Sequence, residues 1–172
     1  MSRCSIFIFL LVFSAFFGNS CFAQPPKNIE AIEKHCTTVD ATKYTVKDFK
    51  NEAFTYWPTK RDSYMHASFQ GEFVKKIVVE LNMGFSTRKY TFYYDSNMLL
   101  KAVLHIDSYD SKITAEQQTV KELFHGEYWF VSEFLVSQTE RGKWVFENPA
   151  NERNSVVKVD SNHYKSKALG KS

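Results

Sequence analysis

Glycine is scarce in this sequence, with 6 residues in 172. Loops that cradle phosphate groups need several closely spaced glycines, because only glycine lets the backbone approach a phosphate so closely. The P-loop, G-x-G-x-x-G and G-x-S-x-G patterns are all missing. Nucleotide chemistry is therefore not expected. The carboxylates, such as Glu72, Glu80 and Asp95, are scattered without the pairing that a glycosidase would need.

Cysteine is equally rare. The chain has three cysteines, and Cys4 and Cys21 both lie within the first 23 residues. If that segment is removed, Cys36 remains alone and no internal disulfide can form, even in an oxidising compartment. A lone cysteine on the apolar stripe of a helix is most often a small buried side chain. We therefore expect Cys36 to be unreactive in the folded protein.

Patterns for binding metals or nucleic acids are missing as well. The five histidines, at positions 35, 66, 105, 125 and 163, never share the three- or four-residue spacing that places two ligands on one helix face. The formal net charge is only +3, and no stretch forms a basic patch. The sequence thus predicts no metal site, no cofactor, no catalytic residue and no nucleic-acid partner.

Long apolar runs are also lacking. The longest, Ile6 to Phe17, is shorter than the roughly 20 residues that a membrane-spanning helix needs. It follows Arg3 and precedes a Cys-Phe-Ala sequence, which is the layout of a secretory signal peptide. We expect cleavage between Ala23 and Gln24, a secreted or periplasmic protein, and no transmembrane span in the mature chain.

One alternative for the N-terminus is a lipid anchor on Cys21. Lipoprotein signals usually carry a Leu-like residue three positions before the cysteine, where this chain has Gly18. Cleavage at residue 23 is therefore favoured. It leaves residues 24–149 as a single α+β domain, followed by residues 150–172, whose few apolar side chains predict a flexible or loosely docked tail.

The domain is expected to begin with a short helix. Ile29, Ile32 and Cys36 recur at helical spacing, and Asn28 can cap the first turn. A second helix is predicted over residues 114–124, where Thr114 and Gln117 fit a capping box, with Gly126 as its end.

Strand patterns fill most of the remaining sequence. From Tyr64 onward, apolar and polar residues alternate, and turn signals occur at 84–87 and 95–97. A later hairpin is expected to turn at Ser132 and Glu133. The predicted fold is an antiparallel β-meander of about five to six strands, with the N-terminal helix and the mid-chain helix packed on the sheet.

Three segments share one design: SFQGEFVKKIVVEL, YTFYYDSNMLLKAVLHI and YWFVSEFLV. In each hairpin a strand with aromatic residues turns into a strand rich in Leu or Val; the first turn contains Gly, the second Asp and Asn, and the third Ser132 and Glu133. This resembles small secreted bacterial proteins of uncharacterised function over about residues 63–137, and distantly the PepSY-like periplasmic modules. Asn97 stands where those hairpins often carry glycine. The resemblance implies a small sheet-based envelope protein and supplies no catalytic residues.

The second face of the meander is more apolar than a face that only meets solvent. The alternation places there the residues Val74, Val78, Tyr93, Leu99, Val103 and, from the late hairpin, Trp129. A covering helix would explain part of this surface, and a protein, peptide or envelope partner would explain the rest.

We take Tyr93, Val103, His105 and Trp129 as candidate binding residues. His105 and Asp107 lie two apart on one strand face, which is more typical of a solvated strand than of an acid-base pair. The expected function is a non-enzymatic binding module. The alternative is an NTF2-like ligand-binding or enzymatic cone, although a helix after three strands does not fit that order.

Overall fold

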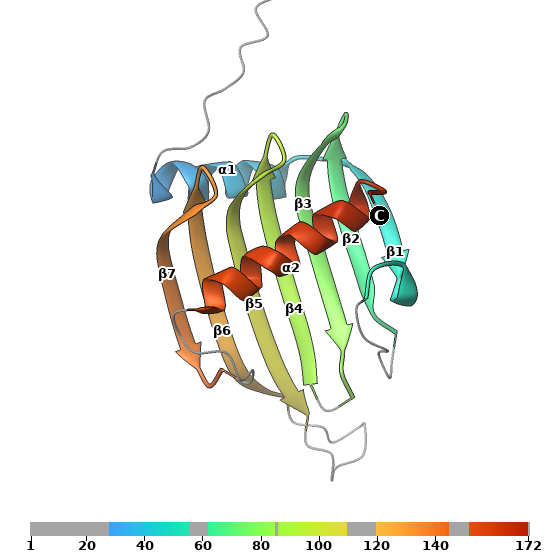
Figure 1. Cartoon of the computed structure of the whole chain (residues 1–172), viewed down its shortest axis with the longest axis vertical. Helices are drawn as coiled ribbons and strands as arrows, with labels where there is room; N and C mark the ends of the chain where they lie inside the picture. Colours follow the sequence, from blue (N-terminus) through green and yellow to red (C-terminus); the bar gives the residue numbers. More distant parts are fainter. Residues whose placement is uncertain (1–27, 56–61, 85, 110–119, 145–151, 172) are drawn as a thin grey trace, which may run out of the picture.

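The computed structural model describes residues 28–55, 62–84, 86–109, 120–144 and 152–171, which form one antiparallel sheet with a helix on each face (Figure 1). In these residues each strand pairs with the next along the chain, giving a seven-stranded meander. The strands are β1 (Thr45–Lys50), β2 (Tyr64–Gln70), β3 (Phe73–Asn82), β4 (Ser86–Asp95), β5 (Met98–Tyr109), β6 (Val120–Val131) and β7 (Phe134–Gly142). The helices are α1 (Ile29–Ala41), α2 (Arg153–Ala168) and the short 3-10 turn η1 (Asn51–Ala53).

The predicted α+β meander is confirmed, with seven strands in place of five to six. The expected N-terminal helix is α1, and the Asn28 side chain accepts a hydrogen bond from the Ala31 amide at 2.8 Å. The predicted turn at Ser132 and Glu133 is also confirmed. Both residues have positive φ, 48° and 66°, which is the backbone that a two-residue hairpin with the twist of a sheet requires. Neither α1 nor α2 has the length and apolar character needed to cross a bilayer.

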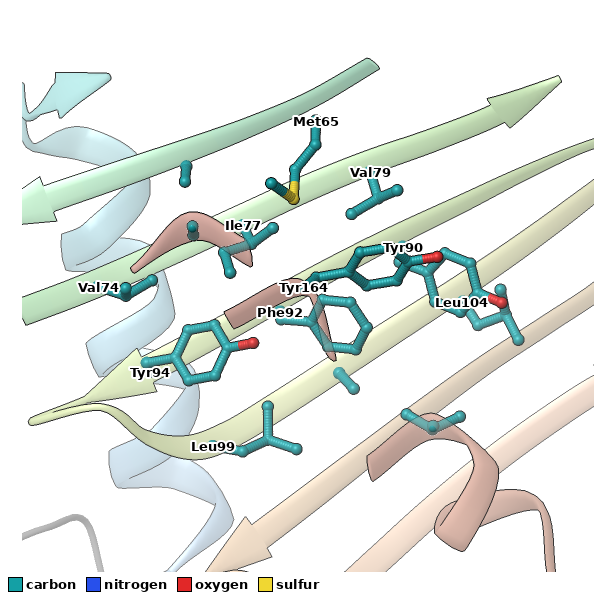
Figure 2. Close-up of a cluster of buried hydrophobic side chains, with 14 of the residues drawn as sticks. Met65, Val74, Ile77, Val79, Tyr90, Phe92, Tyr94, Leu99, Leu104 and Tyr164 are labelled. Carbon is teal, nitrogen blue, oxygen red and sulfur yellow. The ribbon is translucent and has the colours of Figure 1, made fainter. Parts of the chain in front are cut away.

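The main core lies between the sheet and α2, which runs diagonally over the near face in Figure 1. About every second residue of a strand points into this core, including Ile77, Phe92 and Leu104, each no more than 1% exposed (Figure 2). From the helix, the Tyr164 ring lies 5.9 Å from the Tyr90 ring and 6.1 Å from the Phe92 ring. This aromatic layer fixes α2 to the middle strands on that face of the sheet.

Helix α2 corrects the expectation for the C-terminal segment 150–172. Its buried residues are Val157, Ser161, Tyr164 and Ala168, which recur every three or four positions. That is the stripe of a packed amphipathic helix. Only one member is a branched aliphatic residue, so an apolar count alone misses the stripe. Ser161 is buried because its hydroxyl lies 2.9 Å from the hydroxyl of Tyr94, which satisfies both groups.

The predicted mid-chain helix is wrong where it can be compared with the structure. Residues 114–119 lie outside the described residues, and 120–131 form β6. A β-bulge leaves Leu123 without a partner between the paired positions Glu122 and Phe124. The bulge places two apolar residues, Leu123 and Phe124, next to each other. They lie three and four positions after Val120, which is the spacing of a helical stripe.

Gly126, which the sequence pattern presents as the end of that helix, has a packing role in β6. A Cβ atom at Gly126 would lie 2.8 Å from the Tyr128 hydroxyl and 2.9 Å from the Phe124 ring. The glycine thus makes room for two aromatic side chains of its own strand.

Two further bulges move residues between the faces. Lys75 is the extra residue of β3 opposite Ser68 and Phe69. Because of this bulge, the Val74 side chain lies in the main core between the sheet and α2, here called the α2-side core. Leu100 is the extra residue of β5 opposite the pair Tyr93 and Tyr94. The expectation that Val74 and Leu99 lie on the second face is therefore wrong: both belong to the α2-side core.

The second core lies between the sheet and α1. It consists of Ile32, Cys36, Val39, Tyr93, Leu100 and Trp129. Helix α1 thus covers part of the second face, as expected, but only at one end of the strands (Figure 1).

Cys36 gives a first prediction. Its side chain is buried, and burial is the main reason that its thiol pKa rises to about 12. At neutral pH almost no thiolate is present, and the thiolate is the reactive form. A thiol reagent should therefore label Cys36 slowly in the native protein, and urea should expose one reactive thiol per chain in protein cleaved after Ala23. Rapid native labelling would show that α1 does not protect Cys36.

Asp160 on α2 gives a second prediction, because burial raises its carboxyl pKa to about 6 even though the Tyr90 hydroxyl and Arg88 oppose the shift. A raised folded-state pKa means that the protonated form favours folding. This contribution is complete below the ordinary pKa near 4 and is lost as the pH rises through about 6. Asp160→Asn should therefore stabilise the protein at pH 8 in urea unfolding and have little effect at pH 3.5 to 4. Equal effects at both pH values would contradict the prediction.

Candidate functional site on the open face of the sheet

The α1-side face of the sheet is built from rows of side chains, since residues opposite each other in register share a face. The row beneath α1 is Lys76, Tyr93, Lys101 and Trp129. The next two rows are Val78, Thr91, Val103, Glu127 and then Glu80, Lys89, His105, His125, Arg141. Of the described helices, only α1 packs on this face, over the first row. We call the later rows, together with Asp107 and Glu122, the open face.

A salt-bridge cluster marks the boundary between α1 and the open face. The Lys101 ammonium lies 2.6 Å from Glu33 of α1 and 2.7 Å from Glu127 of β6. The same ammonium lies 4.9 Å from the Trp129 ring centre, and the indole N–H of Trp129 donates to Glu33 at 2.5 Å. Three elements are thus joined at one lysine, whose side chain is only 10% exposed.

The charges in this cluster hold each other ionised. Burial lowers the pKa of Lys101, but hydrogen bonds to Glu127 and Glu33 outweigh it and raise the pKa above its ordinary value. Burial likewise raises the pKa of Glu127, and hydrogen bonds from Lys101 and His125 outweigh it and lower the pKa. Glu127 is therefore a carboxylate at neutral pH, with one oxygen on Lys101 and the other on His125.

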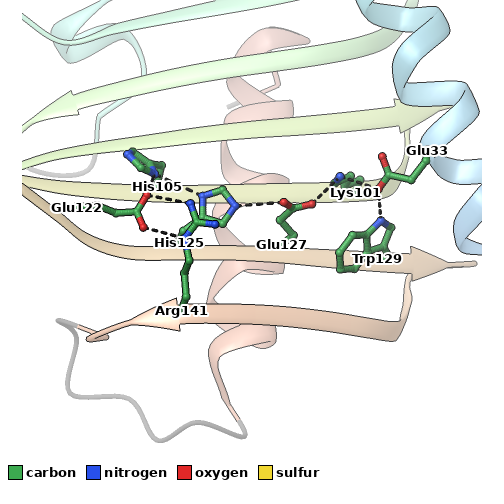
Figure 3. A network of polar contacts seen from close by, with 8 residues as sticks. All are labelled: Glu33, Lys101, His105, Glu122, His125, Glu127, Trp129 and Arg141. Carbon is green, nitrogen blue, oxygen red and sulfur yellow. Dashed lines mark hydrogen bonds and ion pairs between the residues drawn. The ribbon is translucent and has the colours of Figure 1, made fainter.

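Two histidines lie directly opposite each other in β5 and β6. The Nδ1 atoms of His105 and His125 are 3.4 Å apart. The Nε2 atom of each ring faces a carboxylate. Asp107 lies 2.9 Å from His105 Nε2. Glu127 lies 3.2 Å from His125 Nε2 (Figure 3). A carboxylate only accepts hydrogen bonds, so each Nε2 carries the proton. The two Nδ1 atoms are the remaining ring nitrogens, and they face each other.

Glu122 completes this cluster. One of its oxygens lies 3.4 Å from His105 Nδ1, and both bind Arg141, at 2.8 Å to Nε and 3.1 Å to Nη2. The hydrogen bonds from Arg141 lower the pKa of Glu122, so its oxygens are charged acceptors. Ligand atoms of His105, Glu122 and His125 all lie within 4.8 Å of one another.

The structure separates the four candidate binding residues into two pairs. Tyr93 and Trp129 lie beneath α1, each 8% exposed, so they fix the helix to the sheet and do not face solvent. Val103 and His105 lie on the open face and are partly exposed. The predicted placement of His105 and Asp107 on one face is confirmed by their contact.

His125, Glu122 and Glu127 are the site residues that the sequence did not reveal. Spacing within one element does not reveal a site of this kind, because His105 and His125 are 20 residues apart and meet through strand register. A shared face for Lys101 and Trp129, or for His105 and His125, would have been visible only once β6 was recognised as a strand.

The arrangement can hold a cation or a polar partner. Three carboxylates and two imidazoles lie together on a solvent-accessible surface; they belong to Asp107, Glu122, Glu127, His105 and His125. No protein-family model, curated protein or solved structure matches the chain. Function is therefore inferred from this geometry alone.

Proposed function

We propose that the protein is a secreted or periplasmic, non-enzymatic binding module that binds a protein, peptide or envelope component through the open face of its sheet. The observation that carries the proposal is the difference in coverage of the two faces. Helix α2 packs across the middle of one face over the main core, whereas α1 covers only the end row of the other. A broad sheet surface beyond α1 is thus available to a partner.

The side chains of the open face are suited to binding a protein or peptide. Val78 and Val103 are partly exposed apolar side chains in the middle row, and the polar row that contains Lys89, His105 and His125 lies next to them. An apolar centre flanked by polar groups is the usual composition of a protein-binding surface. Secretion is inferred from the leader over residues 1–23, which lie outside the described residues.

A binding role fits this face better than catalysis. Electrostatic catalysis needs a site from which water is excluded. The histidines instead lie on a sheet surface, with side chains 31% and 20% exposed. The NTF2-like cone is also less well supported, because α1 and α2 lie on opposite faces of the sheet and do not line one side of it.

The proposal can be tested by comparing proteins captured from envelope extracts. Tyr93 and Trp129 are unsuitable probes, because their replacement would disturb the packing of α1. Val103→Lys instead changes the middle of the open face and should lose the partner. Val159→Lys, at a 61% exposed position of α2, is the matched control and should retain it. If the two variants and the wild type capture the same proteins, or none, the open face is not the binding surface.

A further inference from the structure

We infer that His105, His125 and Glu122 form a binding site for a divalent transition-metal ion such as Zn²⁺ on the open face. The inference goes beyond the proposed function and does not depend on it, since a metal ion can bind whether or not a macromolecular partner does. It rests on three features of the cluster: the orientation of the lone pairs, the spacing of the atoms and the hydrogen bonds of the outer carboxylates.

The first feature is that three acceptors face one another. Because Asp107 and Glu127 accept hydrogen bonds from the Nε2 atoms, the Nδ1 atoms of both histidines are left to face each other, and a charged oxygen of Glu122 lies 3.4 Å from that of His105. Acceptors at this range repel one another unless a cation lies between them. A proton on one imidazole or a metal ion would meet that need, and neutral imidazole with carboxylate is a typical ligand set for Zn²⁺.

The second feature is distance. Zn²⁺ binds imidazole nitrogen and carboxylate oxygen at about 2.0–2.2 Å, so two ligand atoms of a tetrahedral site lie about 3.4 Å apart. The separations from His105 Nδ1 to His125 Nδ1 and to Glu122 are both 3.4 Å. Two edges of the tetrahedron are therefore already present. The side chains are 20–37% exposed, which leaves a route for the ion and room for a water ligand.

The third feature is the set of supporting contacts. A metal-bound histidine usually donates its other ring N–H to a carboxylate, which fixes the ring and raises its basicity. Asp107 does this for His105 and Glu127 for His125. Arg141 holds Glu122 in place through two hydrogen bonds. All three ligands are thus oriented before an ion arrives.

The test is calorimetric titration of ZnCl₂ into the purified secreted protein, carrying no polyhistidine tag. The wild type should bind about one Zn²⁺ per chain. His105→Ala and His125→Ala should lose this binding, and Asp107→Asn should weaken it by about 10- to 100-fold. The control is His66→Ala, because His66 also pairs with a carboxylate, Asp48 at 2.5 Å, but is not part of the cluster. It should bind like the wild type.

Two further measurements keep the result decisive. If the histidine variants do not fold, the Glu122→Gln variant tests the inference, because it preserves the shape of the side chain. Its affinity for Zn²⁺ should be at least several-fold lower than that of the wild type. Co²⁺ should give the strong visible absorption of a four-coordinate site in the wild type and not in the variants. The inference is overturned if the wild type shows no binding at about 1 mM Zn²⁺, or if binding survives in both histidine variants. Either result leaves the Val103→Lys capture experiment unaffected.

Discussion

Tyr164→Ala is expected to lower the free energy of unfolding by about 3–5 kcal/mol, the range for removing a large buried aromatic side chain. Tyr164 is 2% exposed and lies at the centre of the α2-side core. Its ring contacts the rings of Tyr90 and Phe92 in the sheet and lies 6.3 Å from the ring of Phe54. No neighbouring side chain on a rigid sheet can move far enough to fill the space left behind.

The measurement is equilibrium unfolding in urea, followed by circular dichroism. Because domains of this size are stable by only about 5–15 kcal/mol, the variant should lose a large share of its stability. Val159→Ala is the matched control on the same helix. Val159 is 61% exposed, so its truncation should change stability by no more than about 0.5 kcal/mol. Equal effects of the two substitutions would show that α2 does not pack on the sheet.

Lys101→Met is expected to destabilise the protein by about 2 kcal/mol. The substitution leaves Glu33 and Glu127 without their shared cation and removes the ammonium from the Trp129 ring. The estimate is below the 3–5 kcal/mol typical of a fully buried ion pair, because the Glu33 side chain is 43% exposed and solvent screens it.

Urea unfolding at two pH values tests this prediction. Pairing lowers the pKa of Glu127, so the stabilisation is present at neutral pH and is lost as the carboxylate becomes protonated in acid. Lys89→Met is the matched control: its partner Glu80 lies 3.3 Å away on the same face, but the lysine is 48% exposed. The control should cost no more than about 1 kcal/mol. Similar losses for both lysines would rule out a special role of Lys101 in holding α1.

Strands β3, β4 and β5 could be predicted because apolar and polar residues alternate along most of each strand and short turns join them. The turn residues, such as Ser132 and Glu133, also identify the last hairpin directly. Alternation fails at β-bulges, where one extra residue reverses the face of everything beyond it. Lys75 and Leu100 are two such residues, and they explain why Val74 and Leu99 were expected on the wrong face.

The two helix errors have separate physical causes. The bulge at Leu123 brings apolar neighbours together, and their spacing resembles a helical stripe, so the sequence pattern predicts a helix over part of β6. Helix α2 buries Ser161 and Ala168 together with Val157 and Tyr164, and small or hydroxylated residues contribute little to an apolar pattern. Burial of a serine depends on a partner from the sheet, here Tyr94, which cannot be found from local sequence.

The site was only partly predictable for a related reason. Val103 and His105 lie on a strand whose alternation is clear, and both are on the open face. The register between β5 and β6 determines which side chains surround these two residues. That register pairs His105 with His125 across a connection that includes residues 110–119, and no turn signal fixes it. Spacing in the sequence therefore does not reveal metal ligands that lie on neighbouring strands.

Site-specific photo-crosslinking in the organism that makes the protein tests most directly whether the open face is the binding surface. A photoreactive phenylalanine analogue would replace Val103 or Thr91 on the open face, or Val159 on α2 as the control. Adducts heavier than the chain should form from positions 103 and 91 and not from 159. Adducts from position 159 alone, or none from any position in cells that contain the folded protein, would contradict a binding role for this face.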